Sequence, residues 1–124
     1  MGWLGRLFGR GQTGPVRIEP VWIEPVWIES GELRGRLGRG ENPLILDVRG
    51  PDEFDGPLGH IDGARNVPLA ELPRQIAEIG RETRPVVVVC LTDKRSSQAA
   101  ALLTDFGIRD VAVLRGGMRA WRGE

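Results

Sequence analysis

The chain has 124 residues, of which 40% are apolar and 27% charged, and its 17 basic residues are balanced by 17 acidic ones. This length suits one compact domain, since domains commonly have roughly 100–150 residues, and the apolar fraction excludes a wholly disordered chain. Because the net charge is balanced, the protein has no overall positive electrostatic potential that would attract nucleic acid. We therefore expect no nucleic-acid partner and only local affinity for anions.

Cysteine occurs once, at position 90. A single cysteine forms no intramolecular disulfide, and the sequence has no Cys/His cluster with the three or four ligands of a zinc site. We therefore expect neither a metal nor a cofactor. The first residues lack the cleavage signal of a secretory leader, and no apolar run has the length of a membrane span. These features predict a cytoplasmic location.

The expected organisation is an N-terminal extension over residues 1–25 and a folded domain over residues 26–124. Within residues 3–10, large apolar side chains share one face at helical spacing and arginines occupy another. This pattern is compatible with peripheral contact with an anionic membrane or a partner. The alternative is a frayed tail, because glycines weaken a segment too short for a stable isolated helix.

Residues 16–30 are one pentapeptide written three times, as Val-Arg-Ile-Glu-Pro, Val-Trp-Ile-Glu-Pro and Val-Trp-Ile-Glu-Ser. The prolines lack an N–H donor and favour extended geometry before them, so the segment predicts an extended arm or an edge strand. Large apolar residues on such an arm are also compatible with pairing to a second subunit, which would give a homodimer.

Helical and strand patterns then alternate to the end of the chain. Ser30 is expected to cap a short helix that carries Leu33 and Leu37. Apolar runs without polar alternation predict buried strands, and apolar spacing with glycine stops predicts helices. The expected strands cover 44–48, 86–89 and 111–114, and the later helices cover 69–79, 96–106 and 117–121. This alternation predicts a parallel sheet covered on both faces.

Cys90 follows a buried strand directly and precedes the helix expected at Ser96. It is therefore expected at the carboxyl end of the sheet, where open parallel sheets bind their ligands. The free N–H groups and dipole of the helix N-terminus favour the thiolate. Lys94 and Arg95 add cationic donors suited to an oxyanion substrate. The alternative is an inert core thiol beside an ordinary solvated loop.

Three segments, in this order, resemble the signatures of the rhodanese domain. The first comprises Leu46-Asp-Val-Arg49, Glu53-Phe54 and Gly59-His-Ile-Asp-Gly-Ala-Arg-Asn66; the second is Cys90-Leu-Thr-Asp-Lys-Arg-Ser96; the third is Leu114-Arg-Gly-Gly-Met-Arg-Ala-Trp121. The resemblance covers most of the chain from Ile28 to Trp121. It implies an α/β fold, with a five-stranded parallel sheet flanked by helices on both faces.

The resemblance also implies an enzyme of the thiosulfate sulfurtransferase type. Such a protein moves sulfane sulfur from thiosulfate or a related donor to cyanide or a thiol, through a persulfide on Cys90. The loop would bind the substrate and cradle the persulfide with its backbone N–H groups; its residues are Leu91, Thr92, Asp93, Lys94, Arg95 and Ser96.

Two positions depart from the family pattern. Asp62 stands where the family often has proline, and a turn accepts aspartate readily. Asp93 stands where the loop often has glycine, so it brings a carboxylate close to a thiolate and an anionic donor. We expect Asp93 to weaken thiosulfate activity by repulsion, and to tolerate a left-handed backbone as glycine would. The alternative is that Asp93 faces solvent or a cationic acceptor protein.

Other charged residues admit a catalytic interpretation, but structural pairs and caps are the more usual role of charges at strand ends and turns. This applies to Asp47, Arg49, Glu53 and His60, and we expect His60 to fix its own turn. Arg115 is a candidate support for the active-site loop.

Two competing functions remain open at this point. One is a cysteine-dependent phosphatase or arsenate reductase, whose pattern resembles His-Cys followed by five residues and Arg. Here Val89 precedes the cysteine, and only four residues separate Cys90 from Arg95, so the loop is short for a tetrahedral phosphoryl group. The other is a non-enzymatic module that relays sulfur or binds a partner.

Overall fold

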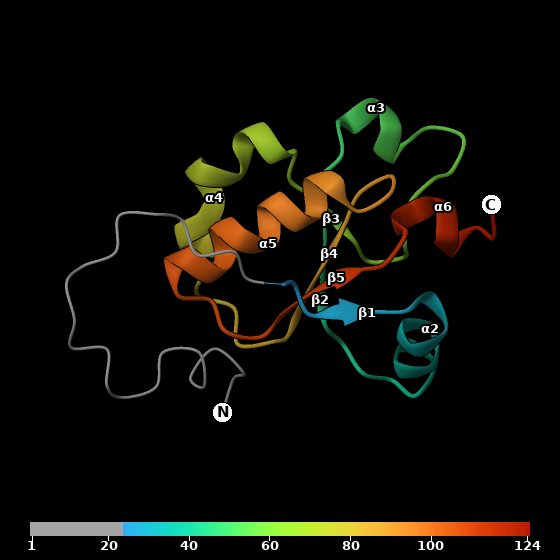
Figure 1. Ribbon diagram of the computed structural model, residues 1–124, viewed down its shortest axis with the longest axis horizontal. Helices are drawn as coiled ribbons and strands as arrows, with labels where there is room; N and C mark the ends of the chain where they lie inside the picture. Colours follow the sequence, from blue (N-terminus) through green and yellow to red (C-terminus); the bar gives the residue numbers. More distant parts are fainter. Residues whose placement is uncertain (1–23) are drawn as a thin grey trace.

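A computed structural model describes residues 24–124 (Figure 1). The expectations for residues 3–10 and for the pentapeptide copies up to residue 23 therefore lie outside the described residues. In chain order the elements are β1 Trp27–Ile28, α2 Ser30–Gly38, β2 Leu44–Asp47, α3 Pro51–Phe54, β3 Arg65–Asn66, η1 Leu69–Glu71, α4 Leu72–Ile79, β4 Val86–Val89, α5 Lys94–Phe106, β5 Val111–Leu114 and α6 Gly117–Trp121.

The strands form one parallel sheet in the order β1-β5-β4-β2-β3. Helices α4 and α5 cover one face, and α2 and α6 cover the other (Figure 1). This confirms the expected α/β fold with a five-stranded parallel sheet flanked on both faces. Strand β4 lies at the centre, between β5 and β2, so the segment that follows it emerges in the middle of the carboxyl edge.

The central strands are apolar, apart from Asp47 at the end of β2, and both of their faces are covered. Alternate residues of β4 belong to different cores: Val86 and Val88 pack with α4 and α5, whereas Val87 and Val89 pack with α2 and α6. All four are nearly inaccessible to solvent. Burial on both faces explains why the sequence shows a continuous apolar run here, without polar alternation.

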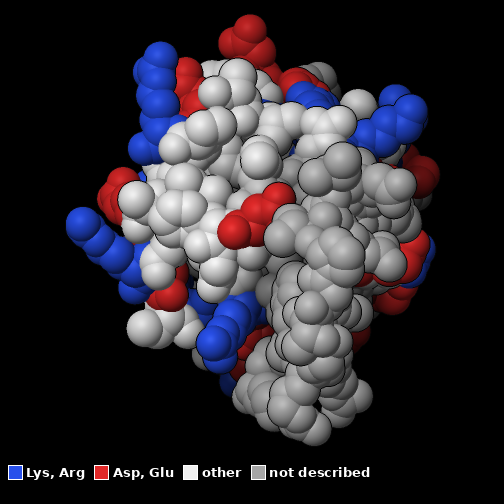
Figure 2. Space-filling model, turned by 60° about the vertical axis from the view of Figure 1, so that its left-hand side comes forward, with Lys and Arg blue, Asp and Glu red and all other residues white. Residues whose placement is uncertain are grey.

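The third copy of the pentapeptide supplies the edge strand. Trp27 and Ile28 pair in parallel register with Val113 and Leu114 of β5, as the edge-strand interpretation of this copy expects. Ile28 is buried in the core beneath α2 and α6. Figure 2 shows another side of the molecule, on which basic and acidic side chains of the described residues are interspersed around a largely uncharged area.

Several predicted boundaries were wrong. Glu29, not Ser30, occupies the N-cap position of α2, and Ser30 Oγ is buried without a hydrogen-bond partner. Residues 69–79 form a 3₁₀ turn followed by α4, with Pro73 in the first turn of α4, where its missing N–H costs no hydrogen bond. Helix α5 begins at Lys94, two residues earlier than expected.

Within residues 24–124, no helix is both long and apolar enough to cross a membrane.

Candidate functional site

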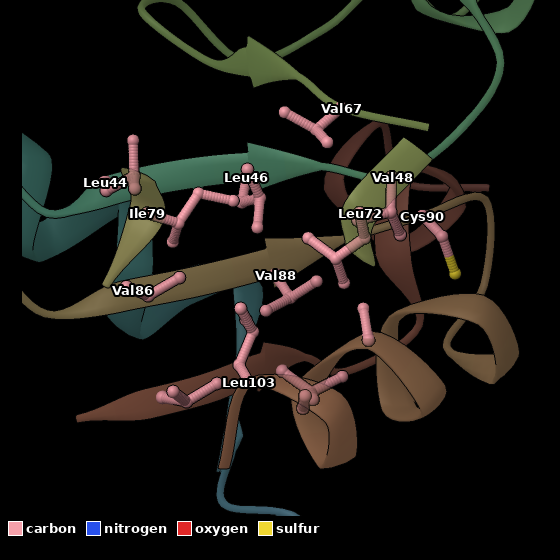
Figure 3. Close-up of a cluster of buried hydrophobic side chains, with 14 residues drawn as sticks. Leu44, Leu46, Val48, Val67, Leu72, Ile79, Val86, Val88, Cys90 and Leu103 are labelled. Carbon is pink, nitrogen blue, oxygen red and sulfur yellow. The ribbon is translucent and has the colours of Figure 1, made fainter. Parts of the chain in front are cut away.

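Cys90 follows β4 at the carboxyl edge of the sheet. Its side chain is 1% exposed and belongs to the apolar cluster between the sheet and helices α4 and α5. Figure 3 shows its sulfur turned toward the first turn of α5. There Sγ accepts the backbone N–H of Ser96 at 3.4 Å and lies 3.3 Å from Ser96 Oγ. The site therefore joins the end of the hydrophobic core to the N-terminus of a 13-residue helix.

The loop between β4 and α5 is short because α5 starts at Lys94. Asp93 occupies its N-cap position, and the Asp93 carbonyl accepts the N–H of Ser97 at 3.0 Å. The backbone of Asp93 has φ −151°, and no described residue other than glycine has positive φ. The expected tolerance of Asp93 for a left-handed backbone is therefore not needed here, and this loop closes without the conformation that favours glycine.

The first turn of α6, together with its N-cap residue Gly116, supports the loop. The N–H groups of Met118 and Arg119 donate to the carbonyls of Cys90 and Leu91, at 2.9 and 3.1 Å. Gly117, at φ +57°, lies so close to the loop that a Cβ atom there would overlap backbone atoms of residues 90–92. The loop and this turn therefore form one packed unit.

Asp93 also contacts this turn. Its Oδ2 accepts the N–H of Gly116 at 3.3 Å. The carboxylate of Asp93 therefore faces the protein, where it has a backbone donor as a partner. Neighbouring Lys94 is exposed and forms no ion pair within the described part of the chain.

Arg95 is bound by a carboxylate from another loop. Its guanidinium forms a bidentate pair with Glu53 of α3, at 2.7 and 2.9 Å. Hydrogen bonding to Arg95 lowers the pKa of Glu53 from 4.5 to about 2. The same bond raises the pKa of Arg95, and the nearby charges of Cys90 and Asp47 add smaller contributions in the same direction. Arg95 thus lies within the electrostatic range of Cys90, but its donors face Glu53.

Asp47 and Arg49 form a second, fully buried pair. Each is 1% exposed, and Arg49 donates to both Asp47 oxygens, with Nη2–Oδ2 at 2.8 Å. Arg49 also donates to the carbonyls of Glu53 and Gly59, at 3.1 and 2.8 Å. Because each partner satisfies the other and the backbone around it, the pair holds the segment that carries Glu53.

His60 contacts the turn that follows α3, and Arg115 contacts the edge strand β1 and the residue after it. The ring of His60 stacks on Phe54, with centroids 3.6 Å apart, and its Nδ1 lies 2.9 Å from the Phe54 carbonyl oxygen. These contacts fix the turn, as predicted. Arg115 binds Glu29 at 2.7 Å and lies over the ring of Trp27. Its side chain therefore binds the β1 segment, whereas the turn that follows it supports the loop.

Two groups escaped sequence reasoning. Glu53 was considered only as a possible catalytic or structural charge, and its pairing with Arg95 spans 42 positions without any local pattern. The sequence placed Gly117 only at the start of the expected helix 117–121. The one sequence signal for its contact with residues 90–92 is the Gly116-Gly117 pair at the start of that helix.

The arrangement suits nucleophilic chemistry at sulfur. A thiolate at this position is stabilised by the N–H of Ser96 and by the positive end of the α5 dipole. Within residues 24–124, no group of His, Cys, Asp and Glu side chains has the arrangement of a metal site.

Comparison with known proteins points to one family. The sequence model of the rhodanese-like domain matches residues 29–124. The chain is 42% identical over 80 residues to the uncharacterized protein YqhL of Bacillus subtilis, covering 64% of this chain and 61% of that protein. It is 40% identical over 77 residues to the thiosulfate sulfurtransferase GlpE of Shewanella oneidensis, covering 62% of this chain and 73% of that one.

Solved structures share the fold. The rhodanese-like domain of Anabaena protein Alr3790 has 34% identity and a TM-score of 0.69, with 81% of this chain and 74% of that chain covered. A Rhodopseudomonas palustris protein described as a possible tyrosine phosphatase has 26% identity and a TM-score of 0.73, with 79% and 80% covered. The phosphatase that the sequence left open as an alternative is thus represented in the name of one similar structure.

Proposed function

Because the chain belongs to the rhodanese-like domain family, we propose that it is a sulfurtransferase that carries sulfane sulfur as a persulfide on Cys90. The observation that carries this proposal is the position of the Cys90 sulfur, which ends a buried strand and accepts the N–H of Ser96 in the first turn of α5. Relatives named as sulfurtransferases, GlpE among them, support the same activity.

The proposed reaction has two displacements. The Cys90 thiolate attacks the outer sulfur of thiosulfate or a related donor, the S–S bond of the donor breaks, and sulfite leaves with the electron pair of that bond. Cyanide or a thiolate then attacks the outer sulfur of the persulfide, and Cys90 leaves as a thiolate. No separate base is needed, because both nucleophiles are anions and both leaving groups depart without a proton.

Intact-protein mass spectrometry tests the covalent step. After treatment with thiosulfate or a hydropersulfide, the chain should gain one sulfur atom, which cyanide removes as thiocyanate. The Cys90→Ser variant, which is nearly isosteric, should gain none. Absence of the adduct in the unmodified chain with every donor would refute the proposal.

Phosphatase activity is the second candidate, favoured by the similarity to the possible tyrosine phosphatase structure. Two features argue against it. The four residues between Cys90 and Arg95 leave a small loop, and Arg95 is already paired with Glu53. A phosphoryl group needs both the wide loop and the free guanidinium. Robust hydrolysis of a phosphomonoester by the unmodified chain would favour this candidate instead.

A non-enzymatic sulfur relay is distinguished by turnover. A relay module loads Cys90 but releases sulfur only to a specific acceptor protein, whereas an enzyme turns over with cyanide or a small thiol. We also propose a cytoplasmic location, since a free thiol nucleophile is kept reduced there.

A further inference from the structure

The cation expected to bind an oxyanion donor is already held by a carboxylate. Both terminal nitrogens of Arg95 donate to Glu53, at 2.7 and 2.9 Å. A bidentate pair fixes the direction of the guanidinium as well as compensating its charge. While Glu53 is ionised, Arg95 therefore adds no net positive charge to the loop that follows Cys90.

Glu53 stays ionised at every physiological pH. Its pKa is about 2, mainly because Arg95 hydrogen-bonds its charged form. Arg95 nevertheless lies close enough to Cys90 for the two charges to interact. Glu53 thus controls a cation that is within range of the reacting sulfur.

The remaining charges at this edge are also balanced. Asp47 and Arg49 compensate each other in a buried pair. Asp93 and Lys94 are adjacent and opposite in sign, and the Asp93 carboxylate faces the protein through its bond with Gly116. The loop therefore offers backbone N–H groups and the dipole of α5, but its side chains carry no net positive charge while Arg95 is paired with Glu53.

This balance separates two kinds of sulfane-sulfur donor. Thiosulfate carries two negative charges, and it must approach a thiolate that carries one more. A helix N-terminus offsets only about half an elementary charge. A hydropersulfide in its protonated form, RS–SH, approaches without this repulsion when its R group is uncharged. The electrostatic cost of approach is therefore larger for thiosulfate.

We propose that Glu53 determines donor specificity: by holding Arg95, it makes the site prefer an uncharged hydropersulfide over thiosulfate. This inference rests on the proposed function, since it concerns what loads Cys90. In the preferred step the Cys90 thiolate attacks the outer sulfur of RS–SH, and the RS–S bond breaks. RS⁻ leaves with the electron pair, and the proton stays on the new Cys90–S–SH. No external oxidant or reductant takes part.

The rate constants for persulfide formation on Cys90 are measured by quenching the reaction at successive times and analysing the intact protein by mass spectrometry. The donors are thiosulfate and the hydropersulfide of 2-mercaptoethanol. The unmodified chain should load faster with the hydropersulfide. Glu53→Gln should raise the thiosulfate rate constant roughly tenfold, the factor expected from one additional charge-assisted hydrogen bond, and should change the hydropersulfide rate constant much less.

Two variants serve as controls. Glu82→Gln makes the same substitution in another Glu–Arg pair, with Arg84 at 2.8 and 3.1 Å, and should leave both rates unchanged. The double variant Glu53→Gln/Arg95→Gln should lose the thiosulfate gain, because the freed guanidinium is removed. A gain that persists in the double variant would contradict the role of Arg95.

A measurement on the unmodified chain keeps the inference testable even if Glu53→Gln fails to fold. Sulfate, a dianion of similar size to thiosulfate, should not slow loading by the hydropersulfide at millimolar concentration. Strong inhibition by sulfate, or thiosulfate loading as fast as hydropersulfide loading, would overturn the inference alone. Loading by neither donor would overturn the proposed function, and this inference with it.

Discussion

Replacing Gly117 with alanine should displace the loop that carries Cys90. Gly117 has φ +57°, in the left-handed region that costs a residue with a Cβ about 1–2 kcal/mol. An alanine Cβ would also lie under 3.0 Å from the carbonyl oxygens of Cys90 and Thr92. Both neighbours are backbone atoms rather than flexible side-chain ends, so the turn or the loop must move.

The two costs add, because one arises within residue 117 and the other from its neighbours. Overpacking of this kind typically costs about 1–3 kcal/mol, which gives a total loss of about 2–5 kcal/mol in the free energy of unfolding. Movement also weakens the hydrogen bonds from Met118 and Arg119 to the loop carbonyls. A misplacement of the reacting sulfur by about 1 Å would slow loading roughly a hundredfold.

Urea unfolding and the loading rate of Cys90 measure the two effects. Gly63→Ala is the matched control, because Gly63 has φ +82° but no atom within 4 Å of a Cβ built there. It should lose only the conformational cost and keep the parent loading rate. If the two variants lose equal stability and load sulfur equally well, the packing of Gly117 against the loop does not constrain the site.

Three further outcomes are expected. Because Arg95 lowers the pKa of Glu53 from 4.5 to about 2, the stabilising contribution of this carboxylate is complete above about pH 4.5 and lost as the pH falls toward 2. The free energy of unfolding of Glu53→Gln should therefore fall less steeply than that of the parent across that pH window. An equal dependence of the free energy of unfolding on pH in the two chains, measured by urea titration at each pH, would contradict this. Asp93→Asn keeps an acceptor for Gly116 but removes a charge, so thiosulfate loading should rise roughly fivefold, or about 1 kcal/mol; if Asp93→Asn and Asp93→Gly both match the parent, electrostatic tuning by Asp93 is wrong. Removing residues 1–25 should reduce association with anionic liposomes or with a second copy in sedimentation experiments, and identical behaviour of both chains would exclude both roles for that segment.

The sequence predicted the parts of the fold that leave a periodic signal. Strands β2, β4 and β5 are buried on both faces, and strands buried in this way have continuous apolar runs in their sequence. Strand β3 comprises only Arg65 and Asn66, and α3 is a helix of only four residues. Neither is long enough for a period to show. Asn66 is held by tertiary bonds to the carbonyls of Asp47 and Arg49, at 3.0 and 2.8 Å.

The site was predictable to the same extent. The position of Cys90 follows from local order, because a thiol directly after a buried strand and before a helix lies at the carboxyl edge of the sheet. The partner of Arg95 does not follow from local order. Glu53 comes from the crossover after β2, and only the three-dimensional meeting of two loops brings it to Arg95. Counted along the sequence, the loop has two cations, Lys94 and Arg95, against one carboxylate, Asp93. In the folded site Glu53 compensates this excess of positive charge.

The strand order β5-β4-β2 divides the site among the segments that follow three neighbouring strands. The segment after β4 supplies the reacting sulfur, the segment after β2 supplies the carboxylate that pairs with Arg95, and the segment after β5 supplies the first turn of α6, which packs against the loop. Each segment can change length or sequence while the strands keep their pairing. Donor preference can thus diverge among descendants of this chain, or be redesigned, through residues 50–60 alone, without disturbing the nucleophile or the sheet that holds it.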